Sequence, residues 1–239
     1  MPASLSSKSR AQLAAVSIST LTTCLFKRGL RNAYMHGIVP AGPGLPRMVG
    51  EAFTLRFIPA REDLDGVASY TGGPNLHQRA FEECPAGHVL VIDTHHETRA
   101  CSCGDLLVAR LKARKVAGIV TDGGFRDSTD VAALGFPAYH SQPAPPPSFI
   151  GLHAVDLNQP IGCAWVAVYP GDVVVGDSEG VVVVPRHLAP EIAAEAFEMT
   201  RYDEFAAQKI KRGRSVLGLY PATDASRTEF ARWNGKRRR

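Results

Sequence analysis

The sequence predicts a mixed α/β fold in a single domain. Short apolar runs that suit buried strands are interleaved with segments of helical periodicity along most of the 239 residues. A chain of this length could form one large domain or two small ones. The proline-rich residues 143–147 (PAPPP) have apolar strand candidates on both sides, so they predict a stiff loop and not a domain boundary.

The N-terminal part of the chain predicts two short helices. Ser9 is placed to cap a helix that starts near Arg10, and a second helix is expected over residues 20–28, with Gly29 at its end. The apolar residues of the second helix that are expected to face inward are Leu21, Leu25 and Phe26. We expect residues 1–16 to form a mobile arm ahead of the folded domain.

Strands and helices alternate in the next part of the chain. Apolar alternation predicts a strand over residues 49–58. A loop and a short helix are expected over residues 63–71, and Gly and Pro predict a turn at 72–75. A helix over 76–83 and a strand over 88–93 should follow.

The C-terminal half predicts mainly strands and one long helix. The expected elements are a helix over 130–134, strands over 136–141, 155–157, 162–168, 173–175 and 181–184, and an amphipathic helix over 188–211. Because Gly213 ends that helix, residues 214–239 are expected to be an extension of the domain. Its last four residues, 236–239, form a basic tail.

Composition excludes several classes of protein. The formal net charge is +4 and the isoelectric point is near 8.9, but much of the excess lies in the basic tail, so a nucleic-acid-binding face is not indicated. No apolar run predicts a signal peptide or a membrane span, and a cytoplasmic protein is expected. The five cysteines are odd in number, and Cys101 and Cys103 lack a second pair, so reduced thiols are expected.

The stretch most suggestive of chemistry is residues 104–127, GDLLVARLKARKVAGIVTDGGFRD. It opens with a Gly-Asp turn, continues as a helical pattern, and passes through a short buried strand into Arg126 and Asp127. Arginine can bind a carboxylate with two hydrogen bonds, and aspartate can hold a hard cation. Together they suit a metal-bound 2-oxo acid, although such residues also occur as an ordinary turn and a solvated ion pair.

The Gly-Asp pair followed by DGGFRD resembles the signature of the RraA-like proteins. Similar segments occur at residues 74–77, 85–93 and 170–177, and the resemblance extends over residues 17–213. That family includes divalent-metal pyruvate aldolases that act on 4-hydroxy-4-methyl-2-oxoglutarate, and the regulator of ribonuclease activity A. The resemblance implies a swivelling β/β/α-type sandwich that assembles as a homotrimer or as a hexamer of two trimers.

The resemblance also implies roles for individual residues. Asp127 would be the direct protein ligand of Mg2+ or Mn2+, Asp105 would hold a metal-bound water, and Arg126 would pair with the substrate. The substrate carboxylate would be received beside Gly104 by the backbone N–H groups of Leu106 and Leu107, and a helix N-terminus is a general anion-binding feature. The long C-terminal helix would send an acidic residue into a neighbouring subunit's site. Its spacing favours Glu204, with Glu198 and Asp203 as alternatives.

These roles suit a lyase that passes through an enolate. Lys112 and Lys115 lie within a helical pattern, so a metal-stabilised enolate is favoured over a Schiff base. Cleavage of a 4-hydroxy-2-oxo acid to pyruvate is expected, with oxaloacetate decarboxylation as a side activity. The alternatives are a regulator that binds ribonuclease E, and a hydratase or dehydratase of a sugar-derived oxo acid.

Five further residues are expected to have structural roles. His77 matches a family position, but a capping or packing role is at least as consistent with its surroundings. His95 and His96 follow a strand, and neighbouring strand side chains point to opposite faces, so the two cannot both bind one metal from a strand. Asp177 and Glu179 resemble a family turn and not a catalytic element.

Overall fold

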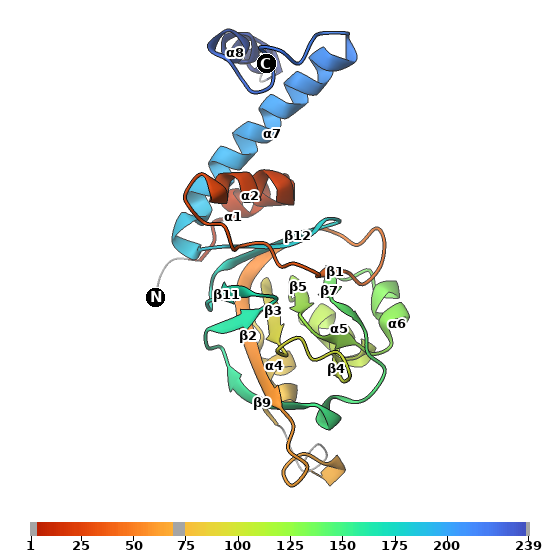
Figure 1. Cartoon of the computed structure of the whole chain (residues 1–239). Coiled ribbons are helices and arrows are strands. Elements are labelled where there is room, and N and C mark those ends of the chain that lie inside the picture. Colours follow the sequence, from red (N-terminus) through yellow and green to blue (C-terminus); the bar gives the residue numbers. More distant parts are fainter. Residues whose placement is uncertain (1–3, 69–74, 238–239) are drawn as a thin grey trace.

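We describe a computed structural model of the chain, in which residues 4–68 and 75–237 are placed (Figure 1). The end of the segment expected over 63–71 and most of the turn expected at 72–75 lie outside the described residues. So does the end of the basic tail.

The centre of the molecule is an eight-stranded mixed sheet. Its strands in spatial order are β1 (Val39–Pro40), β7 (Ala138–His140), β5 (Gly118–Thr121), β3 (His88–Asp93), β2 (Met48–Pro59), β12 (Val173–Asp177) and β13 (Gly180–Val184), with β9 (Leu152–Leu157) paired to the second half of β2. The four central strands β2, β3, β5 and β7 are parallel, and the other pairings are antiparallel. This confirms the predicted α/β class.

The two ends of this sheet are joined by one segment of chain. The amide of Met35 donates to the Val181 carbonyl at 2.9 Å, and the amide of Val183 donates to the Ala33 carbonyl at 2.8 Å. A few residues later the same segment enters β1, which pairs with β7. The sheet therefore nearly closes into a barrel, whose interior is filled by Met48, Val91, Val120, Tyr139, Val174 and Val181 among others.

Two smaller sheets extend the body. A three-stranded parallel sheet consists of β4 (Cys101–Cys103), β6 (Gly124–Phe125) and β8 (Gln142–Pro143). Strands β10 (Ile161–Cys163) and β11 (Val166–Val168) form a hairpin, so the single strand predicted over 162–168 is wrong. Ala164 and Trp165 both adopt positive φ, at 48° and 65°, and these two residues reverse the chain.

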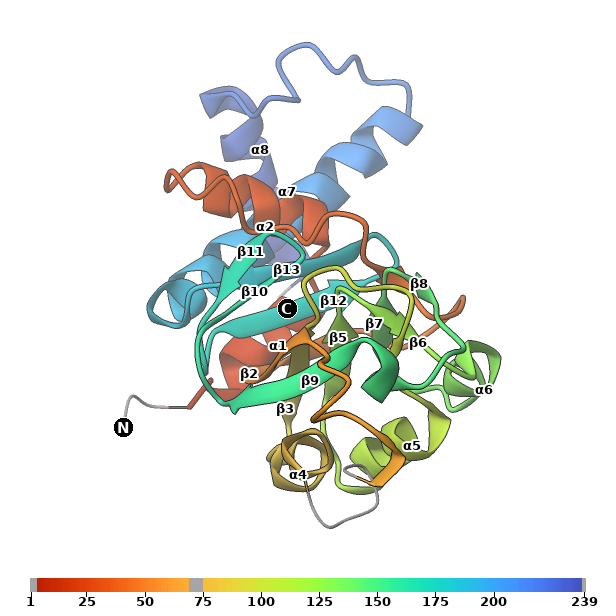
Figure 2. The same cartoon turned by 60° about the horizontal axis from the view of Figure 1, so that its bottom comes forward.

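Helices cover two faces of the main sheet (Figures 1 and 2). Helices α4 (Leu76–Glu83), α5 (Asp105–Ala113) and α6 (Ser128–Ala133) pack against the parallel strands through one apolar cluster. Helices α1 (Ser7–Ala14) and α2 (Ile18–Phe26) pack with the start of α7 (Ala189–Lys211) on β12 and β13 through a second cluster. The short 3-10 helices η1 (Ser148–Ile150) and η2 (Arg186–Leu188) complete the body.

The N-terminal helices differ from the prediction in detail. Helix α1 is capped by Ser6 and not by Ser9, because the Ser6 hydroxyl accepts the Ser9 amide at 3.1 Å. Phe26, expected to face inward, is 62% exposed, since it follows the buried Leu25 by about 100° of helical rotation. The expected mobile arm contains the packed helix α1, with Leu13 fully buried.

The later part of α7 and the residues after it form a C-terminal arm that extends away from the body (Figure 1). The predicted long helix is confirmed as α7, and a second helix, α8 (Asp224–Arg237), folds back against it. The residue pattern of the C-terminal extension does not predict α8. The two helices share a separate aromatic cluster that includes Tyr202, Phe205 and Phe230. Within the described residues, no helix is long and apolar enough to cross a membrane.

Candidate active site

The two motifs of residues 104–127 leave the same edge of the small parallel sheet. Strand β4 runs directly into Gly104 and Asp105, and its neighbour β6 runs directly into Arg126 and Asp127. The amide of Arg126 donates to the Cys103 carbonyl at 3.0 Å, which is the last hydrogen bond between the two strands. Because parallel neighbours end at the same edge, the fold brings the two motifs together.

Gly104 lies in contact with the second motif. A Cβ atom at this position would stand 2.7 Å from Cγ of Arg126 and 3.1 Å from Oδ2 of Asp127. Any larger residue would displace the Arg126 side chain, so glycine is required by close packing and not by an unusual backbone angle. The same distances show that Gly104 lies against both Arg126 and Asp127.

Arg126 and Asp127 form an exposed pair at the start of α6. Nε of Arg126 lies 3.2 Å from Oδ2 of Asp127, and the two side chains are 46% and 41% exposed. Asp127 adopts the left-handed conformation with φ of 51°, and its carboxylate does not cap the helix. The carboxylate is therefore not used by the α6 backbone, and it is accessible to a ligand.

Asp105 is the first residue of α5. The N-cap is Gly104, which has no side chain to accept hydrogen bonds from the first turn of the helix. The N–H groups of the first turn, which include those of Leu106 and Leu107, are thus available to an anion. Leu106 is 79% exposed, and Leu107 is half-buried against the core.

The Gly123–Gly124 pair is explained by packing behind this site. A Cβ on Gly123 would lie 2.7 Å from Oγ1 of Thr94, and one on Gly124 would lie 2.7 Å from the Gln142 carbonyl and would clash with Ala144. The DGG part of the motif therefore allows β6 to fit between its neighbours. Arg126 and Asp127 then emerge at the surface.

The donor atoms of the site fit a hard divalent cation. Among the described residues, no group of three or more His, Cys, Asp or Glu side chains could hold a metal ion. The accessible carboxylate of Asp127 is the kind of oxygen donor that Mg2+ takes, and this ion keeps several waters when bound to protein, so few protein ligands suffice. Cys101 and Cys103 are buried, and burial raises the pKa of both thiols, so soft thiolate ligation is not favoured.

The lysines considered for a Schiff base lie away from the site. Nζ of Lys112 donates to the Leu134 carbonyl, and its side chain is exposed. Lys115 follows the end of α5 and adopts positive φ of 61°. Neither arrangement resembles a desolvated catalytic lysine.

The acidic residues of α7 are not near the site of their own chain, because α7 extends away from β4 (Figure 1). Glu204 lies 4.0 Å from Nε of Arg201 on the same helix. Glu198 and Asp203 line a cavity of about 590 Å³ between α7 and α8, and partial burial raises the pKa of Asp203. Within one chain the structure therefore does not bring Glu204 to Arg126.

His77 is a buried side chain on α4, 5% exposed. Its Nε2 lies 2.7 Å from the Ser102 carbonyl, and burial lowers its pKa to about 4. Asp177 accepts hydrogen bonds from the Ile18 amide at 3.1 Å and from Arg47 at 2.8 Å. Both residues therefore have the structural roles that were considered for them.

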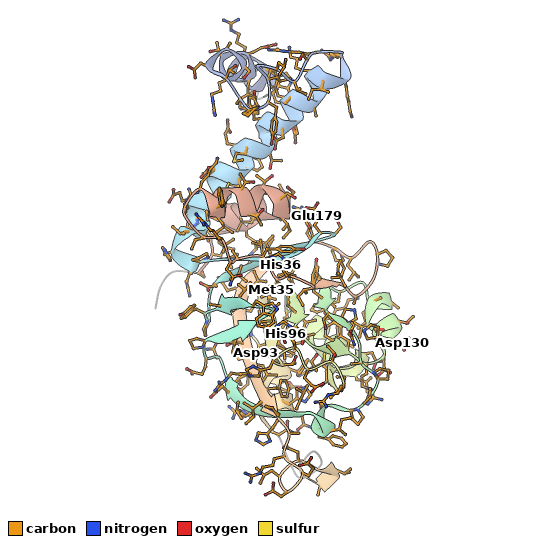
Figure 3. All side chains as sticks on the ribbon, in the orientation of Figure 1. Met35, His36, Asp93, His96, Asp130 and Glu179 are labelled. Carbon is orange, nitrogen blue, oxygen red and sulfur yellow. The ribbon has the colours of Figure 1, made fainter. Side chains whose placement is uncertain are left out.

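His95 and His96 lie at the end of β3, both with positive φ. The His96 ring stacks on Trp165 with 4.4 Å between ring centroids. Figure 3 shows His96 and Asp93 on a different part of the body from Asp130, which belongs to the helix that follows Asp127. A cavity of about 730 Å³ beside α2 is also distinct from the candidate site.

Most of the chain is similar to one family of known proteins. Residues 15–183 match the family model RraA-like, described as Aldolase/RraA. A protein of Halalkalibacterium halodurans named "Putative 4-hydroxy-4-methyl-2-oxoglutarate aldolase" is 33% identical over 145 residues, which are 59% of this chain and 67% of that protein. An uncharacterised protein of Methanocaldococcus jannaschii is 35% identical over 119 residues, 48% of this chain and 57% of its own length.

Solved structures extend the comparison to the fold. The crystal structure of Streptomyces coelicolor RraAS2, described as an unusual member of the RNase ES inhibitor RraA protein family, is 32% identical. It superposes with a TM-score of 0.75 and covers 86% of this chain and 98% of that chain. The likeness therefore includes most of the body.

Proposed function

This chain belongs to the RraA-like family, and we propose that it is a divalent-metal-dependent lyase that cleaves a 4-hydroxy-2-oxo acid to pyruvate. Decarboxylation of oxaloacetate is proposed as a side activity of the same site. One observation carries the proposal: the parallel pairing of β4 and β6 joins the N-terminus of α5 to the Arg126–Asp127 pair. The name of the relative from Halalkalibacterium halodurans supports it.

The substrate would be bound by its carboxylate and 2-oxo group. The uncapped N–H groups at the start of α5 would receive the carboxylate. The Arg126 guanidinium would donate to the oxygen that becomes negative as the bond breaks. A divalent cation held by Asp127 would supply Lewis-acid stabilisation of that negative charge.

Asp105 is proposed to move the proton in the reaction. It would accept the proton of the substrate 4-hydroxyl group as the bond between C3 and C4 breaks. The electron pair of that bond forms the enolate of pyruvate, and the other fragment leaves as a carbonyl compound. The enolate then takes the proton at C3. Loss of carbon dioxide from oxaloacetate breaks the bond between C3 and C4 and gives the same enolate, which takes its proton at C3 from water, so one set of residues serves both reactions.

A screen for pyruvate release tests the proposal. Purified protein with Mg2+ or Mn2+ is offered oxaloacetate and a set of 4-hydroxy-2-oxo acids, and pyruvate is detected with lactate dehydrogenase. We expect turnover of at least one substrate in each class. Release of no pyruvate from any of them, with conversion of a sugar-derived oxo acid by hydration or dehydration, would replace the lyase with the other enolate chemistry.

A second candidate function is regulation of a ribonuclease E-type enzyme by direct binding. It is favoured by the 32% identity to RraAS2, whose description names a ribonuclease inhibitor family. A regulator needs a protein-binding surface, but it does not need a competent Arg126–Asp127 site. Inhibition of a ribonuclease E-type enzyme that is equally strong with Arg126→Lys protein, together with no pyruvate release, would support regulation.

The proposal extends to assembly. A homotrimer or a hexamer would allow α7 of one subunit to approach the site of another, with Glu204 as its contributed carboxylate. Light scattering is expected to give a mass of three or six times 25.7 kDa. A stable monomer would exclude a contribution of Glu204 from a neighbour.

A further inference from the structure

The strand that carries half of the candidate site contains a bulge. Cys101 pairs with Gly124 and Cys103 pairs with Phe125, so β4 has one extra residue, Ser102, opposite a single step of β6. A bulge leaves the extra residue outside the regular ladder and rotates the strand that follows it. The residue that follows this bulge by two positions is Gly104, which contacts Arg126.

Side chains replace the missing ladder bonds at this bulge. The Ser102 hydroxyl donates to the Gly124 carbonyl at 3.0 Å, which ties β4 to β6. The Ser102 carbonyl lies 2.7 Å from Nε2 of His77 on α4. A carbonyl can only accept, so Nε2 of His77 carries the proton and donates it.

His77 is held firmly enough to fix this bond. Its ring packs between Phe57 and Phe81, with centroid distances of 5.3 and 5.4 Å. Ser102 itself has no solvent-exposed surface. Two buried hydrogen bonds in series therefore connect α4, β4 and β6 in a region where an unmade bond would leave a polar group without water.

From the other side, β6 is held by His140 and by β8. The His140 ring stacks on Phe125 at 5.0 Å with an interplanar angle of 18°, and its Nδ1 accepts the Phe125 amide at 3.4 Å. The Ala144 amide donates to the Phe125 carbonyl at 2.8 Å. The residue before Arg126 thus has little freedom to move.

We propose that Ser102 and His77 are positioning residues of the candidate site. They set the register of β4 against β6 at the bulge, and that register sets the distance between the start of α5 and the Arg126–Asp127 pair. The inference rests on the proposed function for its catalytic consequence. Its structural part concerns only the two strands, and it can be tested without turnover.

The experiment measures amide hydrogen exchange and turnover in four variants. Ser102→Ala removes the hydroxyl, His77→Phe removes the donor but keeps a ring, and His77→Gln restores an N–H donor near the position of Nε2. Ser226→Ala is the matched control, because Ser226 is also a fully buried hydroxyl but lies in the C-terminal arm. The reporter is the Arg126 amide, which is bonded to the Cys103 carbonyl, and the reference is the Ile119 amide, which is bonded to the Pro137 carbonyl in the main sheet.

We expect Ser102→Ala and His77→Phe to exchange the Arg126 amide at least about tenfold faster, with no change at Ile119. Turnover number should fall at least about tenfold, since a shift on the order of 1 Å can cost about 100-fold. His77→Gln should recover both quantities towards wild type, and Ser226→Ala should change neither. Equal acceleration at Arg126 and Ile119, or none at Arg126, would overturn the proposal. If the wild type turns over no oxo acid, the proposed function fails, and the exchange data alone still decide the role of Ser102 and His77.

Discussion

The body and the C-terminal arm are stabilised in different ways. In the body, the candidate site residues directly follow the short strands β4 and β6. Gly104 and Gly124 are packed there too closely for a side chain. In the arm, α7 and α8 meet through a local aromatic cluster that does not join the core of the body. The family match ends at residue 183, before α7 begins. The part of the chain that the family model matches therefore lies in the body, and α7 and α8 lie outside that match.

The largest expected effect is on the body and comes from metal removal. Exhaustive treatment with EDTA should abolish turnover, because Arg126 alone would have to stabilise the enolate charge. Addition of Mg2+ or Mn2+ should restore turnover. The far-UV circular dichroism of the whole protein, including the helices of the arm, should not change. Full turnover after EDTA, or trapping of substrate on the protein by borohydride, would contradict a metal-dependent mechanism.

Arg126→Lys should lower the turnover number at least about 100-fold, because loss of a transition-state hydrogen bond of this type costs about 2.7–4 kcal/mol. Lysine keeps the charge but not the planar fork of donors. The loss should be similar for oxaloacetate and for hydroxy-oxo acids. The fold should be unchanged, because the Arg126 side chain is 46% exposed and makes little core packing. Lys112→Ala on α5 is the control for a general loss of positive charge, because Lys112 lies away from the site. Near-wild-type turnover of Arg126→Lys would remove Arg126 from the assigned role.

Phe230→Ala should separate the arm from the body. Phe230 is 8% exposed within the cluster shared by α7 and α8, and truncation of a buried Phe typically costs about 3–5 kcal/mol. Amides of α8 should lose protection from exchange, while those of β3 and β5 keep theirs. Phe136→Ala, in the body cluster under α5 and α6, is the matched variant. In this variant the amides of β3 and β5 should lose protection, while those of α8 keep theirs. Loss of protection throughout the chain in Phe230→Ala would mean that arm and body unfold as one unit.

The smallest expected effect is a difference in pH dependence. His77 has a folded-state pKa of about 4 against 6.5 for a free histidine, because burial disfavours its charged form. Between pH 6.5 and 4 the unfolded chain takes up the proton and the folded chain does not, so the body loses up to about 3 kcal/mol of unfolding free energy as pH falls.

The ion pairs of the arm should respond at lower pH than His77 does. The arm carboxylate Glu229 has a pKa lowered by Lys209 and Arg214, so its contribution is kept until pH falls below the ordinary value of 4.5. Urea unfolding across this pH range gives the unfolding free energy of each region, with one signal from the body and the fluorescence of Trp233 from the arm. His77→Gln should remove part of the slope in the body, and an unchanged slope would mean that His77 is not the responsible group.

The sequence by itself determined the local elements and the chemistry of the motifs. Helix α4 has the predicted bounds because Asn75 and Gln78 form a capping box at its start. Strand β3 also has its predicted bounds, since its apolar run is continuous and bounded by turns. The Gly-Asp and Arg-Asp pairs could be identified as candidate ligands because carboxylate and guanidinium chemistry does not depend on the fold.

Only the tertiary structure decided which of these residues meet. Strands β4, β6 and β8 have two or three residues each, which is too short for a periodic pattern, and their parallel pairing joins segments that are distant in sequence. The same limit hid the role of Ser102, the left-handed turn at Ala164 and Trp165, and the docking of α8 on α7. For Ser102 and α8 the deciding contacts are between residues far apart in the chain, and local propensity carries no information about such contacts. The turn at Ala164 and Trp165 is local, but neither residue type favours positive φ.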